Sequence, residues 1–420
     1  MPKKLQIRLI LGLFAIAGLF MLHRWWREFT VDPDLGTVNT VEWIGAVQHL
    51  DEGSQVVTLK SDGTKVVVPD RVANSTDRSP VWRPDGIRLF FLSDREKDVF
   101  LVYRWNVATN KVEGRATGTR SMSDLSFGPP GYVAKDGTGI ITQGGFVLSY
   151  DPRTGNTQQL LPPVMDDRSQ GEEGGTQDQF DGIYNRLGKS FRLAMWGPDR
   201  ESIIAIMRRE QGEVLIIQGL EPTTDKATGA VRMPGPVPVI AGDRIEAEVT
   251  SDGKVIFSVR GFQWTDPVQI PKEFIKNGVA TTPYRHIVGF FDAKSPEVGL
   301  QPILASPDDR VVPSVPRATP DGKSAMISMG SMNDRGQFLG RDLVLFPIEA
   351  NGGQRGQRIM PGDILDYAWH PSGNSIIFVR REGKNRMIFT AAKDGGAVKN
   401  ISGEGDFGSP VYSPQVEAAK

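Results

Sequence analysis

The chain contains no cysteine among its 420 residues. Disulfides, thiolate nucleophiles and zinc–thiolate sites are therefore excluded. A strong net charge is also missing, because 49 Lys and Arg residues face 50 Asp and Glu residues and leave a formal charge of −1. This balance gives no general attraction to nucleic acid, whose phosphates bind basic surfaces. We expect no nucleic-acid partner and no cofactor.

Long hydrophobic runs are absent after residue 22, and a single run precedes it, from Leu9 to Leu22. Its 14 residues span about 21 Å as a helix, short of the roughly 30 Å hydrocarbon core of a bilayer. Trp25 and Trp26 can lie at the membrane interface and extend the usable length. The same bulky pair occupies the place where a signal peptidase needs small residues. The sequence therefore favours an uncleaved signal anchor over a cleaved signal peptide or a buried helix.

Positive charge is biased toward the start of this segment. Lys3, Lys4 and Arg8 precede the run, whereas Arg24 and Arg27 follow it. Positively charged flanks tend to stay in the cytoplasm. The bias predicts a single-pass membrane protein whose body lies on the extracytoplasmic side, in the periplasm or at the cell surface. An exported chain without cysteine fits a bacterial envelope better than a small disulfide scaffold does.

A helical periodicity is not evident after residue 40, and short apolar runs separated by turn residues take its place. Ser54–Val68 predicts two strands around a Ser-Asp-Gly turn, because Asp-Gly between apolar runs is a hairpin signal. Arg88–Ser93 and Val99–Trp105 predict another pair. The 47 Gly and 29 Pro residues recur at turns. Further strands are predicted at Val255–Val259, Leu343–Ile348 and Ser375–Arg380.

A turn motif repeats along the chain, with an apolar strand after each complete copy. Pro presets φ and Gly accepts positive φ, so the Pro-Asp-Gly core makes a tight turn between two strands. A four-stranded unit cannot bury both of its faces alone, whereas a ring of such units can, as in a β-propeller. The copies, some of them degenerate, are Trp82–Gly86, Ala134–Gly137, Trp196–Asp199, Thr250–Lys254, Ala318–Lys323, Trp369–Gly373 and Val411–Pro414.

The last copy has no strand after it, and it indicates how the ring closes. Val41–Val68 holds about three strands without a preceding turn motif. If Ser409–Tyr412 supplies the missing inner strand, the two ends of the chain complete one blade and remove the exposed edges. The count is then seven blades, and a misread degenerate copy would make it six or eight. The inner strands are expected near Val81, Leu125, Leu193, Ala247, Val315, Tyr367 and Val411.

These units resemble the Pro-Asp-Gly repeat, similar to WD repeats, of TolB-type periplasmic proteins and of the propeller domains of prolyl oligopeptidase-type enzymes. The resemblance covers most of Val41–Pro414 and is best at Ser79–Tyr103, Val315–Ile348 and Asp366–Thr390. It implies an all-β propeller and a binding surface rather than an activity. We expect an anchor or signal segment at 1–27, a linker at 28–40, the propeller at 41–414 and a tail at 415–420.

Two residues of the turn motifs are candidates for a site in the central funnel. His370 replaces the usual Ser or Arg of its motif, and Arg83 occupies the corresponding place in another copy. The alternative is that each is an ordinary turn residue at the end of an inner strand. No Gly-x-Ser-x-Gly motif for serine hydrolysis occurs, and four scattered histidines do not suit the histidine clusters of metal-dependent lyases on similar propellers.

An insertion at Pro162–Lys189 is rich in Gly and in acidic residues. Oxygen ligands at this density can bind calcium, although acidic loops of this composition are usually only solvated. The weak calcium candidates are Asp166, Asp167, Glu172 and Glu173, and no other metal site is expected.

A second insertion, Gly261–Pro283, carries the aromatic residues Trp264 and Phe274. Exposed aromatic side chains on a long loop suit the binding of a protein or a glycan, and the alternative is packing against the rim of a blade. Together these features predict a membrane-anchored module that binds a protein or a cell-envelope polymer. The alternatives are a carbohydrate-active or hydrolytic enzyme that uses the funnel, and a structural subunit of a membrane complex. The sequence favours binding over catalysis.

Overall fold

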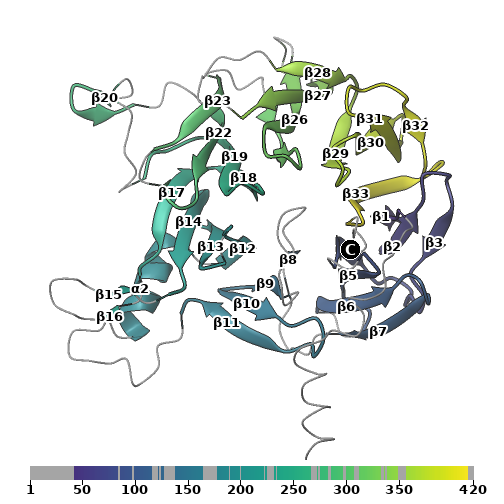
Figure 1. The fold of residues 1–420 in the computed structure, drawn as a ribbon, viewed down its shortest axis with the longest axis horizontal. Helices are drawn as coiled ribbons and strands as arrows, with labels where there is room; N and C mark the ends of the chain where they lie inside the picture. Colours follow the sequence, from purple (N-terminus) through teal and green to yellow (C-terminus); the bar gives the residue numbers. More distant parts are fainter. Residues whose placement is uncertain are drawn as a thin grey trace, which may run out of the picture.

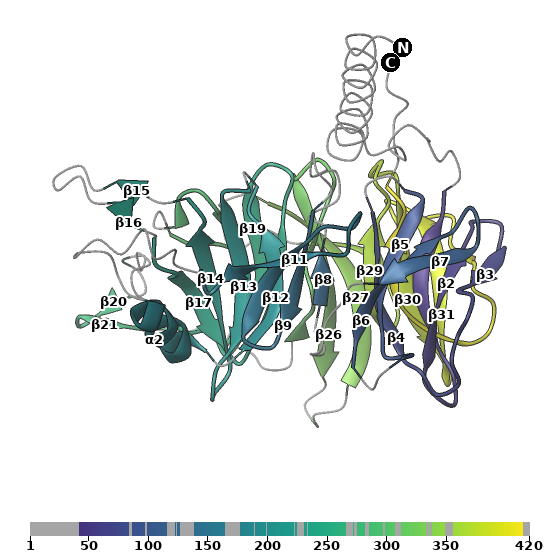
Figure 2. The ribbon, with the colours of Figure 1, turned by 90° about the horizontal axis from the view of Figure 1, so that it is seen from below.

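The computed structural model describes residues 42–83, 86–96, 99–115, 122, 124–126, 138–163, 177–188, 190–198, 200–221, 223–224, 231–232, 234–265, 272, 275–281, 285–296, 299–306, 312–332, 335, 338–348 and 356–414. Their strands form sheets, antiparallel except where β31 meets β33, that are arranged in a ring around a central axis (Figure 1). The side view shows that most strands of the ring run between its two faces (Figure 2). The chain is therefore an all-β propeller.

Six sheets have four or more strands in the part of the chain that the structure describes. The largest contains β29 (Ile364–Trp369), β30 (Ser375–Glu382), β31 (Asn385–Ala392), β32 (Lys399–Asn400), β33 (Asp406–Tyr412), β1 (Ile44–His49), β2 (Ser54–Leu59) and β3 (Lys65–Val67).

The other large sheets follow one another along the chain. They contain β4 (Asp77–Trp82), β5 (Arg88–Ser93), β6 (Leu101–Asn106) and β7 (Lys111–Arg115); β8 (Asp124–Ser126), β9 (Gly139–Gln143), β10 (Phe146–Tyr150) and β11 (Thr157–Leu161); β12 (Ser190–Trp196), β13 (Ser202–Arg208), β14 (Glu213–Gly219) and β17 (Val237–Gly242); β18 (Arg244–Val249), β19 (Lys254–Arg260), β22 (His286–Asp292) and β23 (Gln301–Ser306); and β24 (Val312–Pro313), β25 (Arg317–Ala318), β26 (Ser324–Met332), β27 (Phe338–Pro347) and β28 (Gln357–Met360).

The sequence predicted seven separate blades, but the large hydrogen-bonded sheets among the described residues are fewer than seven. The last and first units of the chain merge into the eight-stranded sheet, because β31 and β33 pair in parallel at Arg386 and Asp406. An ion pair between these two side chains accompanies the junction. The number of separate large sheets is therefore smaller than the number of repeats in the sequence.

The predicted closure of the ring is confirmed. Strand β33 pairs antiparallel with β1, with Ile44 opposite Tyr412. Beyond the strands, the Trp43 amide donates to the Ser413 hydroxyl at 3.0 Å, and the Ser413 amide donates to the Trp43 carbonyl at 2.8 Å. The two ends of the described chain are thus bonded to each other, and the facing edges of β1 and β33 are paired.

Six of the seven expected inner strands are present. Val81, Leu125, Leu193, Ala247, Tyr367 and Val411 lie in β4, β8, β12, β18, β29 and β33, whereas Val315 lies between the short strands β24 and β25. Strands β4, β12 and β29 each end in a tryptophan, whose indole N–H donates to a backbone carbonyl of the preceding unit at 3.2 Å in every case. The bonds are Trp82 to Val411, Trp196 to Thr138 and Trp369 to Arg317.

The core lies between neighbouring sheets. Phe91 and Trp105 of one sheet are fully buried and pack in one cluster with Val56 of the sheet before and Ile141 of the sheet after. Full burial of one such side chain stabilises the fold by about 1.5–3 kcal/mol. Repetition of these interfaces around the ring fixes the inner strands, and the inner strands position the candidate site.

One prediction about local structure is wrong. Helix α2 (Gln177–Leu187) occupies the end of the acidic insertion, where no helix was expected. Ile183, Tyr184 and Leu187 follow the spacing of an apolar helix face. Tyr184 is buried beside Phe191, with ring centroids 6.0 Å apart.

Two short hairpins lie outside the ring (Figure 1). They are β15 (Thr223–Thr224) with β16 (Val231–Arg232), and β20 (Ile275–Lys276) with β21 (Val279–Ala280).

Candidate functional site

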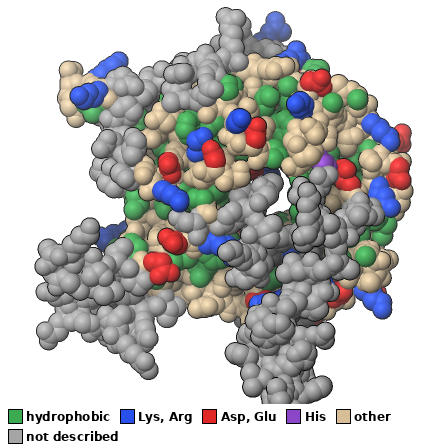
Figure 3. Space-filling model, in the orientation of Figure 1, with side chains coloured by type: hydrophobic (Ala, Val, Ile, Leu, Met, Phe, Trp, Pro, Cys, Tyr) green, Lys and Arg blue, Asp and Glu red, His purple; other side chains and the backbone are tan. Residues whose placement is uncertain are grey.

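The inner strands bring ionisable side chains of both signs into the middle of the ring. Figure 3 shows a face of the molecule that is hollowed at its centre and carries scattered charges. Most of these side chains are partly exposed, and their electrostatic interactions connect strands that are far apart in sequence. The residues are Arg78, Asp124, Arg192, Glu246, Glu248, Arg317 and Asp366.

Arg192 of β12 joins its own sheet to β18. Its guanidinium lies 2.7 Å from a carboxylate oxygen of Glu213 and 3.3 Å from one of Glu246. It also donates to the carbonyl oxygen of Ile245. Arg244, at the start of β18, contacts the Glu246 carboxylate at 2.8 Å, and its side chain is 50% exposed. These residues form a charged cluster at the end of the channel where the inner strands begin.

Glu248 joins β18 to the following sheet. Its carboxylate accepts from the Arg317 guanidinium at 2.9 Å and from the Ala318 amide at 3.0 Å. The Glu248 side chain is almost fully buried. A buried carboxylate is stable when charged donors surround it, so this contact fixes the junction between two inner strands.

Asp366 joins β29 to β33 through backbone groups. Its two oxygens accept from the Tyr367 amide at 2.9 Å and from the Ser409 amide at 3.1 Å. Burial raises the pKa of Asp366, and the charge of Arg317 and the two amide donors oppose that rise. Arg78 makes a similar bridge, because it donates to the Met122 carbonyl at 3.0 Å.

Asp124 is a second carboxyl of the channel whose pKa is raised. Burial raises the pKa of its carboxyl to about 7, although the Leu125 amide and the charges of Arg192, Arg78 and Arg317 lower it. The structure gives this carboxyl no ion pair among the described residues. A carboxyl of this pKa can hold or release a proton near neutrality.

Two ion pairs connect neighbouring sheets along this wall, Arg192 with Glu246 and Arg317 with Glu248. Within the described ranges, no group of three or more His, Asp or Glu side chains is placed to hold a metal ion. Of the described histidines, His286 is buried within β22.

The two turn residues predicted for the funnel are both buried. Arg83 is 4% exposed, and its backbone closes the turn with Arg88 and Gly86. His370 is 5% exposed; its ring contacts the Ser372 hydroxyl at 2.7 Å and the Glu42 carboxylate at 3.4 Å, and lies edge-on to Tyr412. His370 therefore lies against the closure of the ring. A role for either residue in binding stays a prediction.

Trp264 packs against the rim of its blade. Its ring meets Phe262 edge-on at 4.7 Å, and its indole N–H donates to the Thr281 carbonyl at 3.2 Å. The other predicted site residues lie outside the described residues. They are Phe274, the calcium candidates Asp166, Asp167, Glu172 and Glu173, and the anchor residues Leu9, Leu22, Trp25 and Trp26.

Across the residues with a described structure, no helix has the length and apolar character needed to cross a membrane. The anchor predicted at residues 1–27 belongs to the part outside those residues, so the anchor stays a prediction.

The charged inner wall was not among the predicted features. A signal was present, because Asp124, Arg192, Glu246 and Asp366 each stand immediately before the predicted centre of an inner strand. An ionisable residue inside an apolar strand is unusual unless it faces water or a partner. This pattern could have marked the channel.

No family model matches the chain, and no curated protein matches its sequence. Similar solved structures include TolB from Acinetobacter baumannii, with 14% identity, a TM-score of 0.43, and coverage of 89% of this chain and 66% of that chain. Oligogalacturonate lyase from Vibrio parahaemolyticus has 10% identity, a TM-score of 0.49, and coverage of 87% and 85%. The β-propeller domain of Cps50 (Swd1) from Myceliophteria thermophila has 11% identity, a TM-score of 0.41, and coverage of 78% and 87%.

Proposed function

We propose that this chain is a TolB-like binding module, held outside the cytoplasm by a membrane anchor at residues 1–27, that binds a protein or an envelope polymer at the mouth of its channel. The observation that carries the proposal is the inner wall of paired charges. Complementary charge gives specificity and steers encounter, and a rigid ring holds these charges in place without spending binding energy on ordering.

We count the eight-stranded sheet as two blades, β29 to β32 and β33 with β1 to β3, because one parallel residue pair joins the halves. With the other large sheets, this count supports a ring of seven blades. Side-chain hydrogen bonds link neighbouring inner strands on both sides of the merged sheet, through Trp82 on one side and Trp369 on the other.

The closure also suggests how the ring is oriented. Glu42 lies beside His370, and Ile44 lies opposite Tyr412, at the end where β29 and β33 finish. An anchor that precedes Glu42 would therefore hold this end toward the membrane. The opposite mouth, where Arg244 and Glu246 begin β18, would face a partner.

Co-purification tests the proposal. The full chain is extracted from its native membrane in detergent, alongside a variant with Arg244→Glu and Glu246→Arg. We expect the unaltered chain to retain a stoichiometric protein or polymer and the variant to lose most of it. Lys384→Glu serves as the control, because Lys384 is exposed in the turn between β30 and β31. Equal retention by the mouth variant would contradict binding at the channel.

The second candidate is a carbohydrate-active or hydrolytic enzyme that uses the channel, and Asp124 favours it. A carboxyl with a pKa of about 7 can act as an acid or a base at neutral pH. This function predicts release of cleaved products from an envelope polymer, with a rate that depends on a group titrating near pH 7. Asp124→Asn should abolish that release, whereas a binding module would show no release with either chain.

A further inference from the structure

A row of three arginines lies at the end of the ring where the inner strands begin. Arg244 is the first residue of β18, and Arg208 and Arg260 are the last residues of β13 and β19, which run antiparallel to inner strands. All three residues are exposed. We call Arg208, Arg244 and Arg260 the arginine row. It borders the channel mouth, and the proposed function leaves open which chemistry a partner presents to it.

Strand pairing places the members of the row near one another. Arg244 and Arg260 are directly opposite each other in the antiparallel pair of β18 and β19. Arg208 is opposite Glu213 in the pair of β13 and β14, and the Glu213 carboxylate lies 3.4 Å from the Arg244 guanidinium. Residues opposite each other in such pairs have Cβ atoms about 4.5–5.5 Å apart. The row therefore runs across the boundary between two neighbouring sheets.

The two carboxylates beside the row are already engaged by other donors. Glu213 lies 2.7 Å from the Arg192 guanidinium, and it accepts from the Ile245 amide at 2.8 Å. Glu246 lies 3.3 Å from the same guanidinium. Both carboxylates thus bond to groups of the chain itself, and little of their charge is left to neutralise the row.

An excess of positive charge remains around the row. Within the part of the chain that the structure describes, Arg208 and Arg260 form no ion pair. Among the exposed charged residues at these turns and strand ends, basic residues outnumber acidic ones. They are Arg208, Arg209, Glu210, Asp243, Arg244, Arg260 and Arg285.

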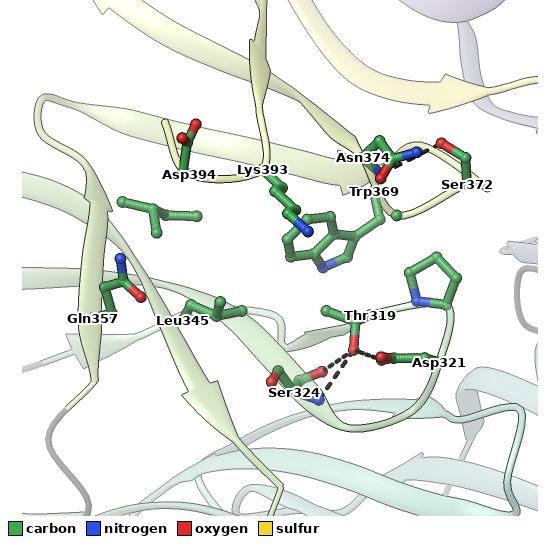
Figure 4. Close-up of a pocket in the computed structure, with 13 residues that line it drawn as sticks. Thr319, Asp321, Ser324, Leu345, Gln357, Trp369, Ser372, Asn374, Lys393 and Asp394 are labelled. Atoms are coloured by element: carbon green, nitrogen blue, oxygen red, sulfur yellow. Dashed lines mark hydrogen bonds between the residues drawn. The ribbon is translucent and has the colours of Figure 1, made fainter. Parts of the chain in front are cut away.

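The excess belongs to one end of the ring and not to the surface as a whole, because the formal net charge of the chain is −1. At the opposite end, side chains of opposite charge lie near one another. Lys254 lies 2.8 Å from Asp252 in the turn between β18 and β19. Figure 4 shows another part of that end, where Lys393 and Asp394 line the same cleft.

The pair of Arg244 and Arg260 costs stability in the free chain. Like charges directly opposite each other in an antiparallel pair repel and destabilise it. An anionic group bound between the two guanidinium groups removes this repulsion. Each planar guanidinium can also donate two parallel hydrogen bonds to one carboxylate or phosphate group. The row therefore suits a ligand with anionic groups.

The extent of the row indicates a ligand with repeated charges. Neighbouring strands lie about 4.8 Å apart, and the row crosses strands of two sheets, so it presents several positive charges in succession. A polymer with a charge on every unit can contact them together, whereas a protein segment needs acidic residues at matching places. We propose that the arginine row binds an anionic cell-envelope polymer through its carboxylate or phosphate groups. This inference rests on the proposed function, because the row borders the channel mouth.

The test is isothermal titration of the full chain with sodium alginate, which repeats a carboxylate, and with sodium polyphosphate, which repeats a phosphate. We expect saturable binding of at least one polymer, and at least a tenfold loss of affinity in the double variant Arg208→Gln and Arg260→Gln. Both residues are exposed, so the fold should persist, and circular dichroism checks it. Lys111→Gln with Lys323→Gln is the matched control, because it removes the same charge at exposed positions of the opposite end. The control should bind as tightly as the unaltered chain.

Three results would overturn the proposal. The first is the absence of saturable binding of both polymers. The second is equal affinity of the double variant and the control variant, because binding would then not depend on the row. The third is tighter binding of poly-L-glutamate, an acidic polypeptide, than of either polymer. A native partner that co-purifies with the chain, without binding of either polymer, would defeat this inference alone. Binding of a polymer at the row, with equal retention of the native partner by the mouth variant, would defeat the proposed function alone.

Discussion

At the scale of single residues, the best-defined ionic contact is the pair of Asp77 and Arg95. One Arg95 nitrogen lies 3.1 and 3.0 Å from the two Asp77 oxygens, and the Asp77 carboxylate also accepts from the Val56 amide. Asp77 is 0% exposed and the Arg95 side chain 5%. The Asp77 carboxylate therefore ties β4 both to the segment after β5, through Arg95, and to β2, through the Val56 amide.

Asp77→Ala should lower the free energy of unfolding by about 3–5 kcal/mol, because it leaves a buried guanidinium without its counter-charge. Urea denaturation followed by far-UV circular dichroism measures the change. Arg153→Ala is the matched control. Its ion pair with Asp151 is about one-third exposed, and its loss should cost less than about 1 kcal/mol. An equal loss of unfolding free energy in both variants would show that burial does not determine how much these ion pairs contribute to stability.

Asp124 gives a pH-dependent prediction. The pKa of its carboxyl is about 7 in the folded chain, against 3.8 for the ordinary side chain. The folded state thus keeps the proton while the unfolded state loses it, and this group lowers stability as the pH rises from about 4 to 7. Asp124→Asn should remove this loss and gain about 1–3 kcal/mol at pH 8, with little change at pH 4.

Unfolding free energies measured at pH 4, 6 and 8 check this prediction. Asp321→Asn is the control of opposite sign, because the Thr319 hydroxyl lowers the pKa of that exposed carboxyl. Its stabilising effect is present above about pH 4 and is lost as the pH falls. A uniform gain from Asp124→Asn at all three pH values would contradict the raised pKa.

At the scale of elements, the closure strand β33 connects the two ends of the chain. It pairs with β1 over Ile44 to His49, and Phe407 within it is fully buried. Its neighbours Ile44, Val57 and Ile388 share one apolar cluster with Phe407. Removal of β33 would expose this cluster and an unpaired strand edge.

Truncation after Gly405 should therefore abolish a single cooperative unfolding transition and increase binding of a hydrophobic dye. Truncation after Pro414 is the control, because it leaves β33 and the Trp43–Ser413 bonds intact. Differential scanning calorimetry compares the two. An unchanged melting temperature after loss of β33 would show that the ring does not need its closure.

Local sequence patterns predicted most of the strands, whereas most side-chain contacts between distant strands could not be predicted from them. The run Arg88–Ser93 is strand β5, and the predicted partner of Val41–Val68 is β33. The Asn277-Gly278 turn was overlooked, although Asn-Gly is a hairpin signal, and it joins β20 to β21. The contact of Arg192 with Glu213 and Glu246 depends on how three separate strands meet, which periodicity within one strand does not specify.

At the scale of the whole molecule, the proposed function depends on one end of the ring. The channel mouth at that end is charged, with Arg244 and Glu246 at its edge. Binding at the channel mouth is the central claim of the proposed function.

Site-specific photo-crosslinking tests that claim most directly. A benzophenone amino acid replaces Arg244 at the mouth, or Lys384 on the exposed turn between β30 and β31, in the full chain within its native membrane. The account predicts a discrete crosslinked species from position 244 and none from position 384. No crosslink from position 244, or the same species from both positions, would contradict a partner seated at the channel.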